Sequence, residues 1–120
     1  MSVALPIVLV GLPGAGKSKV GRLLAGRLGV PHVDTDDLIV EREGRAISDI
    51  FATDGESAFR LMETVAVADA LSRRAVVSLG GGAAATDAVR DLLAGHIVVY
   101  IDAPHDELVR RTASKTHRPL

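Results

Sequence analysis

The sequence of 120 residues is 48% hydrophobic and 24% charged, which is typical of one folded domain, here residues 1–120, rather than of a disordered chain. A formal net charge of -1 gives no electrostatic reason to expect a nucleic-acid or membrane-surface partner. The lack of cysteine excludes disulfides and thiolate metal sites, and no apolar run approaches the ~20 residues of a membrane span, so we expect a cytoplasmic protein.

Segments typical of strands and of helices alternate along the chain. The first strand ends at Val10, and the following helix is predicted to end at Gly29, because glycine is a frequent helix stop. Thr53–Glu56 has the pattern of a capping box, which predicts the start of a long helix, and Thr86 is expected to cap a later one. The predicted apolar face of the first helix consists of Val20, Leu23, Leu24 and Leu28. Strands are predicted at 7–10, 32–36, 75–79 and 96–102, and the later helices at 37–42, 47–51, 53–73, 86–93 and 105–113.

The predicted strands are apolar throughout, which indicates burial on both faces, and the alternation of strands with helices implies parallel pairing. We therefore expect an α/β fold, a three-layer α/β/α sandwich with a parallel sheet. Ligands of such sheets bind outside the carboxyl ends of the strands. The segments that follow strand ends should then meet at one edge, and they are Gly11–Ser18, Asp34–Asp36 and Gly80–Gly82.

The first of these segments matches the phosphate-loop pattern G-x-x-x-x-G-K-[ST] between a strand and a helix. In such a loop backbone N–H groups surround a phosphate, Lys17 would reach the β- and γ-phosphates, and the Ser18 hydroxyl would ligate Mg²⁺. A glycine-rich turn without a ligand is the alternative, but the flanking strand and helix favour a nucleoside triphosphate. The predicted nucleotide contacts are Gly14, Ala15, Gly16, Lys17, Ser18 and Lys19.

Two further groups of polar residues are candidates for the site. Asp34 and Asp36 are expected on opposite faces of a strand end, where one could hold Mg²⁺ through water and the other could accept a hydroxyl proton; alternatively, one or both cap the next helix. Arg60 and Glu63 could form an ion pair, although a pair at this spacing is usually a solvated surface contact. Three consecutive glycines at 80–82 would let the backbone approach a ligand closely.

The segments GLPGAGKS, DTD, DGESAFRLMETV, SLGGGA and THRPL, in this order, resemble shikimate kinase. The resemblance implies the P-loop NTPase fold of the nucleoside-monophosphate-kinase-like type. It also implies ATP-dependent phosphorylation of the 3-hydroxyl of shikimate, which gives shikimate 3-phosphate and ADP in aromatic amino-acid biosynthesis. One Mg²⁺ ion, small-molecule substrates only and a cytoplasmic monomer belong to the same expectation.

The resemblance also implies roles for particular residues. Asp36 would contact the acceptor hydroxyl and serve as base, and Asp34 would hold Mg²⁺ indirectly. Arg60 would bind the substrate carboxylate, which suits its planar guanidinium. Backbone contacts to the substrate would come from Gly80, Gly81 and Gly82. Arg118 would face the nucleotide phosphates, and the expected catalytic residues are Lys17, Asp36 and Arg118.

The sequence departs from the family pattern in two places. Lys19 stands where the family usually has threonine, and the sequence ends at Leu120, whereas family members continue with most of a lid, a second substrate-binding arginine and further elements. We therefore expect the C-terminal elements of the fold to be missing and little phosphoryl transfer by the chain as given. The alternatives are a related kinase acting on gluconate or a nucleoside monophosphate, or a non-catalytic nucleotide-binding fragment.

Overall fold

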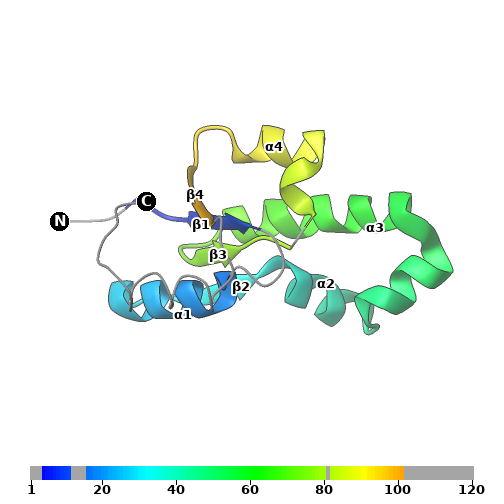
Figure 1. Ribbon diagram of the computed structural model, residues 1–120, viewed down its shortest axis with the longest axis horizontal. Helices are drawn as coiled ribbons and strands as arrows, with labels where there is room; N and C mark the ends of the chain where they lie inside the picture. The colour runs from blue at the N-terminus through cyan, green and yellow to red at the C-terminus, as the bar shows by residue number, and fades with distance from the viewer. Residues whose placement is uncertain (1–3, 12–15, 81, 102–120) are drawn as a thin grey trace, which may run out of the picture.

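The computed structural model describes residues 4–11, 16–80 and 82–101. Strands and helices alternate along this part of the chain, as predicted (Figure 1). The helix predicted at 105–113 lies outside the described residues. The elements are β1 (Ile7–Gly11), α1 (Lys17–Leu28), β2 (His32–Asp34), α2 (Thr35–Glu43), α3 (Ile47–Leu71), β3 (Val76–Ser78), the 3₁₀ turn η1 (Ala83–Ala85), α4 (Asp87–Leu93) and β4 (Ile97–Ile101).

The described strands form one parallel sheet of four strands in the order β2-β3-β1-β4. Ser78 of β3 is in register with Leu9 of β1 on one side and with Asp34 of β2 on the other. Because all pairs are parallel, the carboxyl ends of the strands lie at one edge of the sheet. The described parts of the three segments that were predicted to meet follow the strand ends at this edge.

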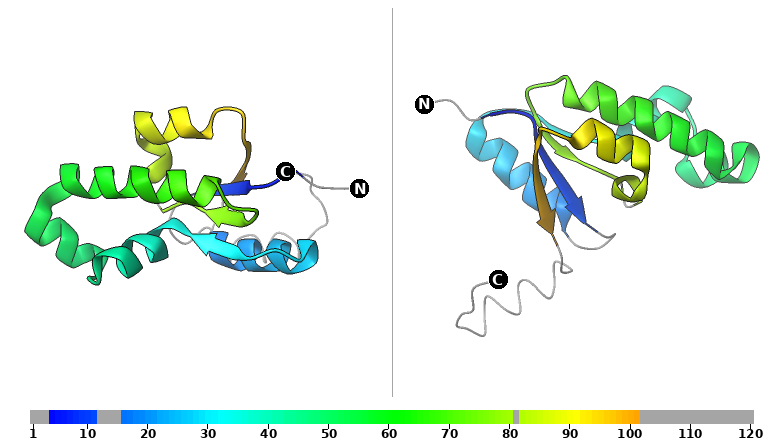
Figure 2. Two further views of the ribbon diagram at one scale, coloured as in Figure 1. Left: turned by 180° about the vertical axis from the view of Figure 1, so that it is seen from behind. Right: turned by 90° about the horizontal axis from the view of Figure 1, so that it is seen from above.

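Helices cover both faces of the sheet (Figures 1 and 2). On one face Ile7 and Leu9 of β1 pack with Ala25 of α1. On the other face Val8 and Val10 pack in a cluster that includes residues of α3 and α4. Alternate residues of the same strand therefore enter two different cores, as the two-residue period of a strand requires. The predicted three-layer sandwich is confirmed.

The buried face of α1 differs from the prediction at one residue. Leu23 is 62% exposed, whereas Gly21 and Ala25 are the fully buried residues of the helix. The other three predicted apolar residues are partly buried against the sheet. At 100° per residue the buried arc covers positions 20, 21, 24, 25 and 28, and position 23 lies outside it. Small side chains at the centre of this arc allow the helix to approach the sheet.

The capping box predicted at Thr53–Glu56 was wrong. The Thr53 hydroxyl donates to the carbonyl oxygen of Asp49 at 2.7 Å, one turn back in a helix that already began at Ile47. The helix is instead interrupted at Gly55, whose backbone (φ 88°, ψ 169°) is not helical. The side chains of Phe51 and Phe59 pack across this kink with ring centroids 4.7 Å apart.

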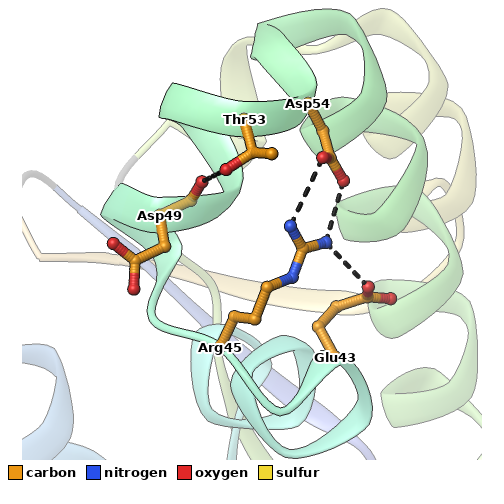
Figure 3. A network of polar contacts seen from close by, with 5 residues as sticks. All are labelled: Glu43, Arg45, Asp49, Thr53 and Asp54. Atoms are coloured by element: carbon orange, nitrogen blue, oxygen red, sulfur yellow. Dashed lines mark hydrogen bonds and ion pairs between the residues drawn. The ribbon is translucent and has the colours of Figure 1, made fainter.

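A polar network closes the turn between α2 and α3 (Figure 3). The Arg45 guanidinium donates to Asp54 at 2.8 Å and to Glu43 at 3.2 Å. The hydrogen bonding between Arg45 and Asp54 holds the pKa of Asp54 below its ordinary value. The network joins the end of α2 to the residue just before the kink in α3, so it fixes the angle between the two helices at the end remote from the sheet.

Three further predictions need correction. The second strand ends at Asp34 rather than 36, because Thr35 already belongs to α2. Thr86 occupies the N-cap position of α4 as predicted, but its side chain forms no capping hydrogen bond. The strand β4 is not buried on both faces, since its first four side chains are exposed, Tyr100 by 71%.

Among the described residues no helix is both long and apolar enough to span a bilayer.

Candidate active site at the carboxyl edge of the sheet

The described part of the phosphate loop lies between β1 and the start of α1. Gly16 is the N-cap of α1 and has a φ of 90°, a conformation that glycine adopts readily. The Lys17 ammonium donates to the carbonyl oxygen of Gly11 at 2.6 Å, so it lies over the end of β1. Ser18 lies in the first turn of α1, as does the exposed side chain of Lys19. Gly14 and Ala15 lie outside the described residues.

Asp34 is the N-cap residue of α2. Its Oδ1 atom accepts hydrogen bonds from the backbone N–H groups of Asp36 at 2.8 Å and Asp37 at 3.3 Å. The helix-capping alternative is therefore true of Asp34. The expectation that Asp34 and Asp36 lie on opposite faces of a strand was wrong, because residues two apart in a strand share a face and Asp36 lies in a helix.

The Asp36 carboxyl group lies against the backbone of Gly80. A Cβ atom on Gly80 would lie only 2.2 Å from Oδ1 of Asp36, so a side chain at residue 80 would displace the carboxylate. Burial raises the pKa of Asp36 to about 6, and the negative charges of Asp34 and Glu63 act in the same direction, while Lys17 opposes them. The structure thus holds a carboxyl group whose pKa is close to neutral, which is suited to accepting a proton.

Sequence reasoning missed the role of Thr35. This side chain is fully buried, and its hydroxyl accepts a hydrogen bond of 2.9 Å from the backbone N–H of Gly80. The bond ties the start of α2 to the glycine turn after β3, and it holds Asp36 beside that turn. The place of Thr35 between two aspartates was the one signal that could have pointed to it.

Arg60 lies against the other described glycine of the turn. A Cβ atom on Gly82 would lie 2.9 Å from Nη2 of Arg60. The Arg60 guanidinium also donates to Oε1 of Glu63 at 2.8 Å, and Glu63 is only 1% exposed. The pair is therefore not a solvated surface contact, and its hydrogen bond raises the pKa of Arg60. Arg60 is a permanently charged, oriented cation at this edge.

The turn after β3 thus brings two oppositely charged side chains to one place. The carboxylate of Asp36, from α2, packs on Gly80. The guanidinium of Arg60, from α3, packs on Gly82, so both groups lie against the same turn of backbone. The middle glycine of the turn, Gly81, and the predicted nucleotide contact Arg118 lie outside the described residues.

Oxygen ligands suited to Mg²⁺ lie near the start of α1 and α2. Ser18 supplies a hydroxyl group, and Asp34 supplies a carboxylate that uses Oδ1 for capping. Across the described residues no group of three or more His, Cys, Asp or Glu side chains is placed to hold a metal ion. Mg²⁺ commonly takes one or two carboxylates together with substrate phosphates, so these two donors fit an ion that binds with a nucleotide.

A parallel sheet between two helical layers, with the phosphate-loop sequence between β1 and α1, defines a P-loop protein of the nucleoside-monophosphate-kinase-like fold. The sequence profile of the shikimate kinase family matches residues 13–120. The chain belongs to the shikimate kinase family.

Individual relatives agree with this assignment. The chain is 54% identical over 114 residues to the shikimate kinase of Mycobacterium avium, covering 94% of this chain and 65% of that protein. It is 52% identical to the shikimate kinase of Corynebacterium glutamicum, covering 95% of this chain and 68% of that protein. The chain thus spans about 65% of the length of its mycobacterial relatives.

Solved structures of shikimate kinases have the same fold. The enzyme from Acinetobacter baumannii in complex with shikimate gives a TM-score of 0.78 at 42% identity, covering 95% of this chain and 65% of that one. The enzyme from Aquifex aeolicus gives a TM-score of 0.77 at 35% identity, covering 97% of this chain and 72% of that one.

Proposed function

We propose that the protein transfers the γ-phosphoryl group of ATP to the 3-hydroxyl of shikimate, giving shikimate 3-phosphate and ADP, a step of aromatic amino-acid biosynthesis. Family membership supports the reaction, and the relative from Acinetobacter baumannii was solved with shikimate bound. The single observation that carries the proposal is the turn after β3. There Gly80 contacts a carboxyl group and Gly82 contacts a guanidinium, which are the groups that an acceptor with one reacting hydroxyl and one carboxylate needs.

On the acceptor side, Asp36 would orient the 3-hydroxyl and take its proton as the oxygen attacks the γ-phosphorus and the bond to ADP breaks. A pKa of about 6 leaves Asp36 largely ionised at pH 7, and therefore able to act as base. Arg60 would bind the shikimate carboxylate, and its bond to Glu63 holds the guanidinium in place for that task. Backbone groups of Gly80, Gly81 and Gly82 would complete the acceptor site.

On the nucleotide side, phosphoryl transfer requires the protein mainly to position groups and to neutralise charge. Lys17 would neutralise charge on the β- and γ-phosphates, while the loop N–H groups around Gly16 would bind phosphate oxygens. Ser18 and, through water, Asp34 would hold one Mg²⁺ ion, which would supply further positive charge next to the phosphates. By family resemblance Gly14, Ala15, Lys19 and Arg118 would also contact the nucleotide.

The enzyme would act in the cytoplasm as a monomer on small molecules, without nucleic-acid or membrane partners. The formal net charge of -1 supports the absence of a polyanionic partner.

An ADP-release assay tests the reaction. It would compare shikimate with gluconate and a nucleoside monophosphate as acceptors, using this chain and a version extended by the remaining part of the Mycobacterium avium relative. We expect ADP release only with shikimate, and greater release by the extended version. Release that is equal with all three acceptors, or absent from both proteins, would contradict the proposal. Binding of ATP without turnover would instead identify a non-catalytic nucleotide-binding protein.

A further inference from the structure

One buried polar cluster lies between the sheet and the first turn of α1, in a layer that is otherwise apolar. Ser78 of β3 is fully buried on the side of the sheet that faces α1. Burying a hydroxyl group costs free energy unless it forms hydrogen bonds, so the partners of Ser78 explain its place there. The apolar residues of this layer are Ile7, Leu9, Ala25, Val76 and Ile101.

Ser78 joins a strand to the start of α1. Its Oγ atom lies 2.8 Å from Nε2 of His32 and 3.3 Å from the backbone carbonyl oxygen of Lys17. A hydroxyl group has one hydrogen, and the carbonyl can only accept. All three groups are satisfied when the Nε2–H of His32 donates to Ser78 and the Ser78 hydroxyl donates to Lys17. The cluster therefore links β2, β3 and the first residue of α1.

A glycine in α1 makes room for this cluster. A Cβ atom on Gly21 would lie 2.6 Å from Nε2 of His32 and 3.0 Å from Oγ of Ser78. Gly21 lies one helical turn after Lys17, so α1 lies close to the imidazole just after its first turn. Residue 21 lacks a side chain, and residues 32 and 78 form a polar pair. These two features are far apart in the sequence, but both are needed for α1 to pack against the cluster.

We propose that His32 and Ser78 are positioning residues of the nucleotide site, which fix the first turn of α1 and hence the phosphate-binding groups of Lys17 and Ser18. The inference rests on the proposed function, because it assumes that this loop binds a nucleoside triphosphate. A shift in the Lys17 backbone would move its ammonium away from the end of β1, where it now lies 2.6 Å from the Gly11 carbonyl oxygen. Small displacements of positioning groups weaken binding and slow transfer.

The position of the cluster predicts a selective effect. Its hydrogen bonds lie between the sheet and α1, whereas Arg60 lies on α3 and contacts the glycine turn. Loss of the cluster should therefore weaken nucleotide binding and leave binding of the acceptor carboxylate nearly unchanged. A role in general stability would affect both ligands alike.

The test compares Ser78→Ala and His32→Leu with the unmodified protein. Isothermal titration calorimetry with Mg·ATP and, separately, with shikimate would give both dissociation constants. Loss of one neutral hydrogen bond should raise the Kd for Mg·ATP about three- to ten-fold, with the Kd for shikimate unchanged. His32→Gln retains an N–H donor near the position of Nε2, so it should restore most of the affinity. The double variant should be little worse than either single variant, because both remove one shared link.

Two control variants match these changes in chemistry. Ser72→Ala removes a hydroxyl that donates to a helix carbonyl oxygen, that of Asp69, at 2.7 Å, but at the end of α3. His96→Leu replaces a histidine that directly precedes β4. Neither should change the Kd for Mg·ATP.

An unchanged Kd for Mg·ATP in both test variants would overturn the inference while leaving the proposed function intact. Losses for both ligands that follow the loss of unfolding free energy would also overturn it. If Ser78→Ala does not fold, the contrast between His32→Leu and His32→Gln decides the matter. If neither the unmodified protein nor its extended version binds Mg·ATP, the proposed function fails and this inference fails with it.

Discussion

The proposed nucleotide side and the proposed acceptor side of the site are built in different ways. The phosphate-loop residues of the nucleotide side are local, since Gly11, Gly16, Lys17 and Ser18 lie within one strand–loop–helix segment. The acceptor side is assembled from distant elements, because Asp36 of α2 and Arg60 of α3 meet only at the glycine turn that follows β3. A local motif can be found from residue spacing alone, whereas an assembled site depends on tertiary packing. The two sides should also respond differently to substitution.

The largest effect is expected from Asp36→Asn on the acceptor side. The test uses the extended version of the protein, because little transfer is expected from the chain as given. The amide has nearly the same shape but cannot take the hydroxyl proton, so kcat should fall by roughly 10²–10⁴-fold. Calorimetric Kd values for Mg·ATP and shikimate should change little. Asp37→Asn, at the exposed neighbouring position, is the matched control. If kcat fell by less than about ten-fold, Asp36 would not be the catalytic base.

Arg60→Lys should have the next largest effect. Lysine keeps the positive charge but loses the planar guanidinium that can bind a carboxylate through two hydrogen bonds. One charge-assisted hydrogen bond contributes about 1.5–3 kcal/mol, so the Kd for shikimate should rise roughly 10- to 100-fold. The Kd for Mg·ATP should stay within a factor of two or so. Equal losses for both ligands would show that Arg60 has a structural rather than a binding role.

The same contrast explains how much the sequence could predict. The phosphate-loop pattern and the end of α1 could be predicted from the sequence, because a glycine at a left-handed position, such as Gly29 (φ 70°), is a local signal. The burial of Glu63 could not be predicted from the sequence, because its spacing to Arg60 is equally typical of a surface pair. Thr35 was missed for the same reason, since its partner, the N–H of Gly80, is distant in sequence.

Errors within single elements have equally physical causes. Leu23 fits a helical period, but the buried arc of α1 is centred on small residues that contact the sheet. The strand prediction for residues 32–36 extends to Asp36, but Asp34 is the N-cap of α2. The helix therefore begins at Thr35, and Asp36 lies in the helix. The roles of the glycines at 80–82 required the family resemblance, because spacing alone could not say which side chains pack on them.

Alanine at the two described glycines of the turn compares the two acceptor groups directly. In Gly80→Ala the new methyl group would lie 2.2 Å from Oδ1 of Asp36, a short side chain on a helix tied to the turn by Thr35. In Gly82→Ala it would lie 2.9 Å from Nη2 of Arg60, the far end of a flexible side chain. We therefore expect Gly80→Ala to lower kcat by roughly ten-fold or more, because it moves the base. Gly82→Ala should change the Kd for shikimate only a few-fold.

Steady-state kinetics of both variants, made in the extended version of the protein and measured with varied shikimate, would separate these effects. A reversed order, with the larger loss of kcat in Gly82→Ala, would mean that Arg60 rather than Asp36 is the group closer to the reacting atoms. Equal and small changes would mean that the turn adjusts without moving either side chain.

The smallest expected effect concerns stability and pH. The folded protein raises the pKa of Asp36 from 3.8 to about 6, mainly through burial, so between these values the folded state binds more protons than the unfolded chain. Ionised Asp36 therefore destabilises the fold above pH 6, and this penalty disappears as the pH falls below 3.8. Asp36→Asn should unfold at higher urea concentration than the unmodified protein at pH 8. The gain is of order 1 kcal/mol, because solvent screens a partly exposed carboxylate. The difference between the two proteins should be slightly smaller at pH 6, roughly a third as large at pH 4.5, and close to zero only below pH 3.8. A difference that stays constant over this pH range would mean that the substitution acts through packing, and that the carboxylate at the acceptor site carries no electrostatic penalty.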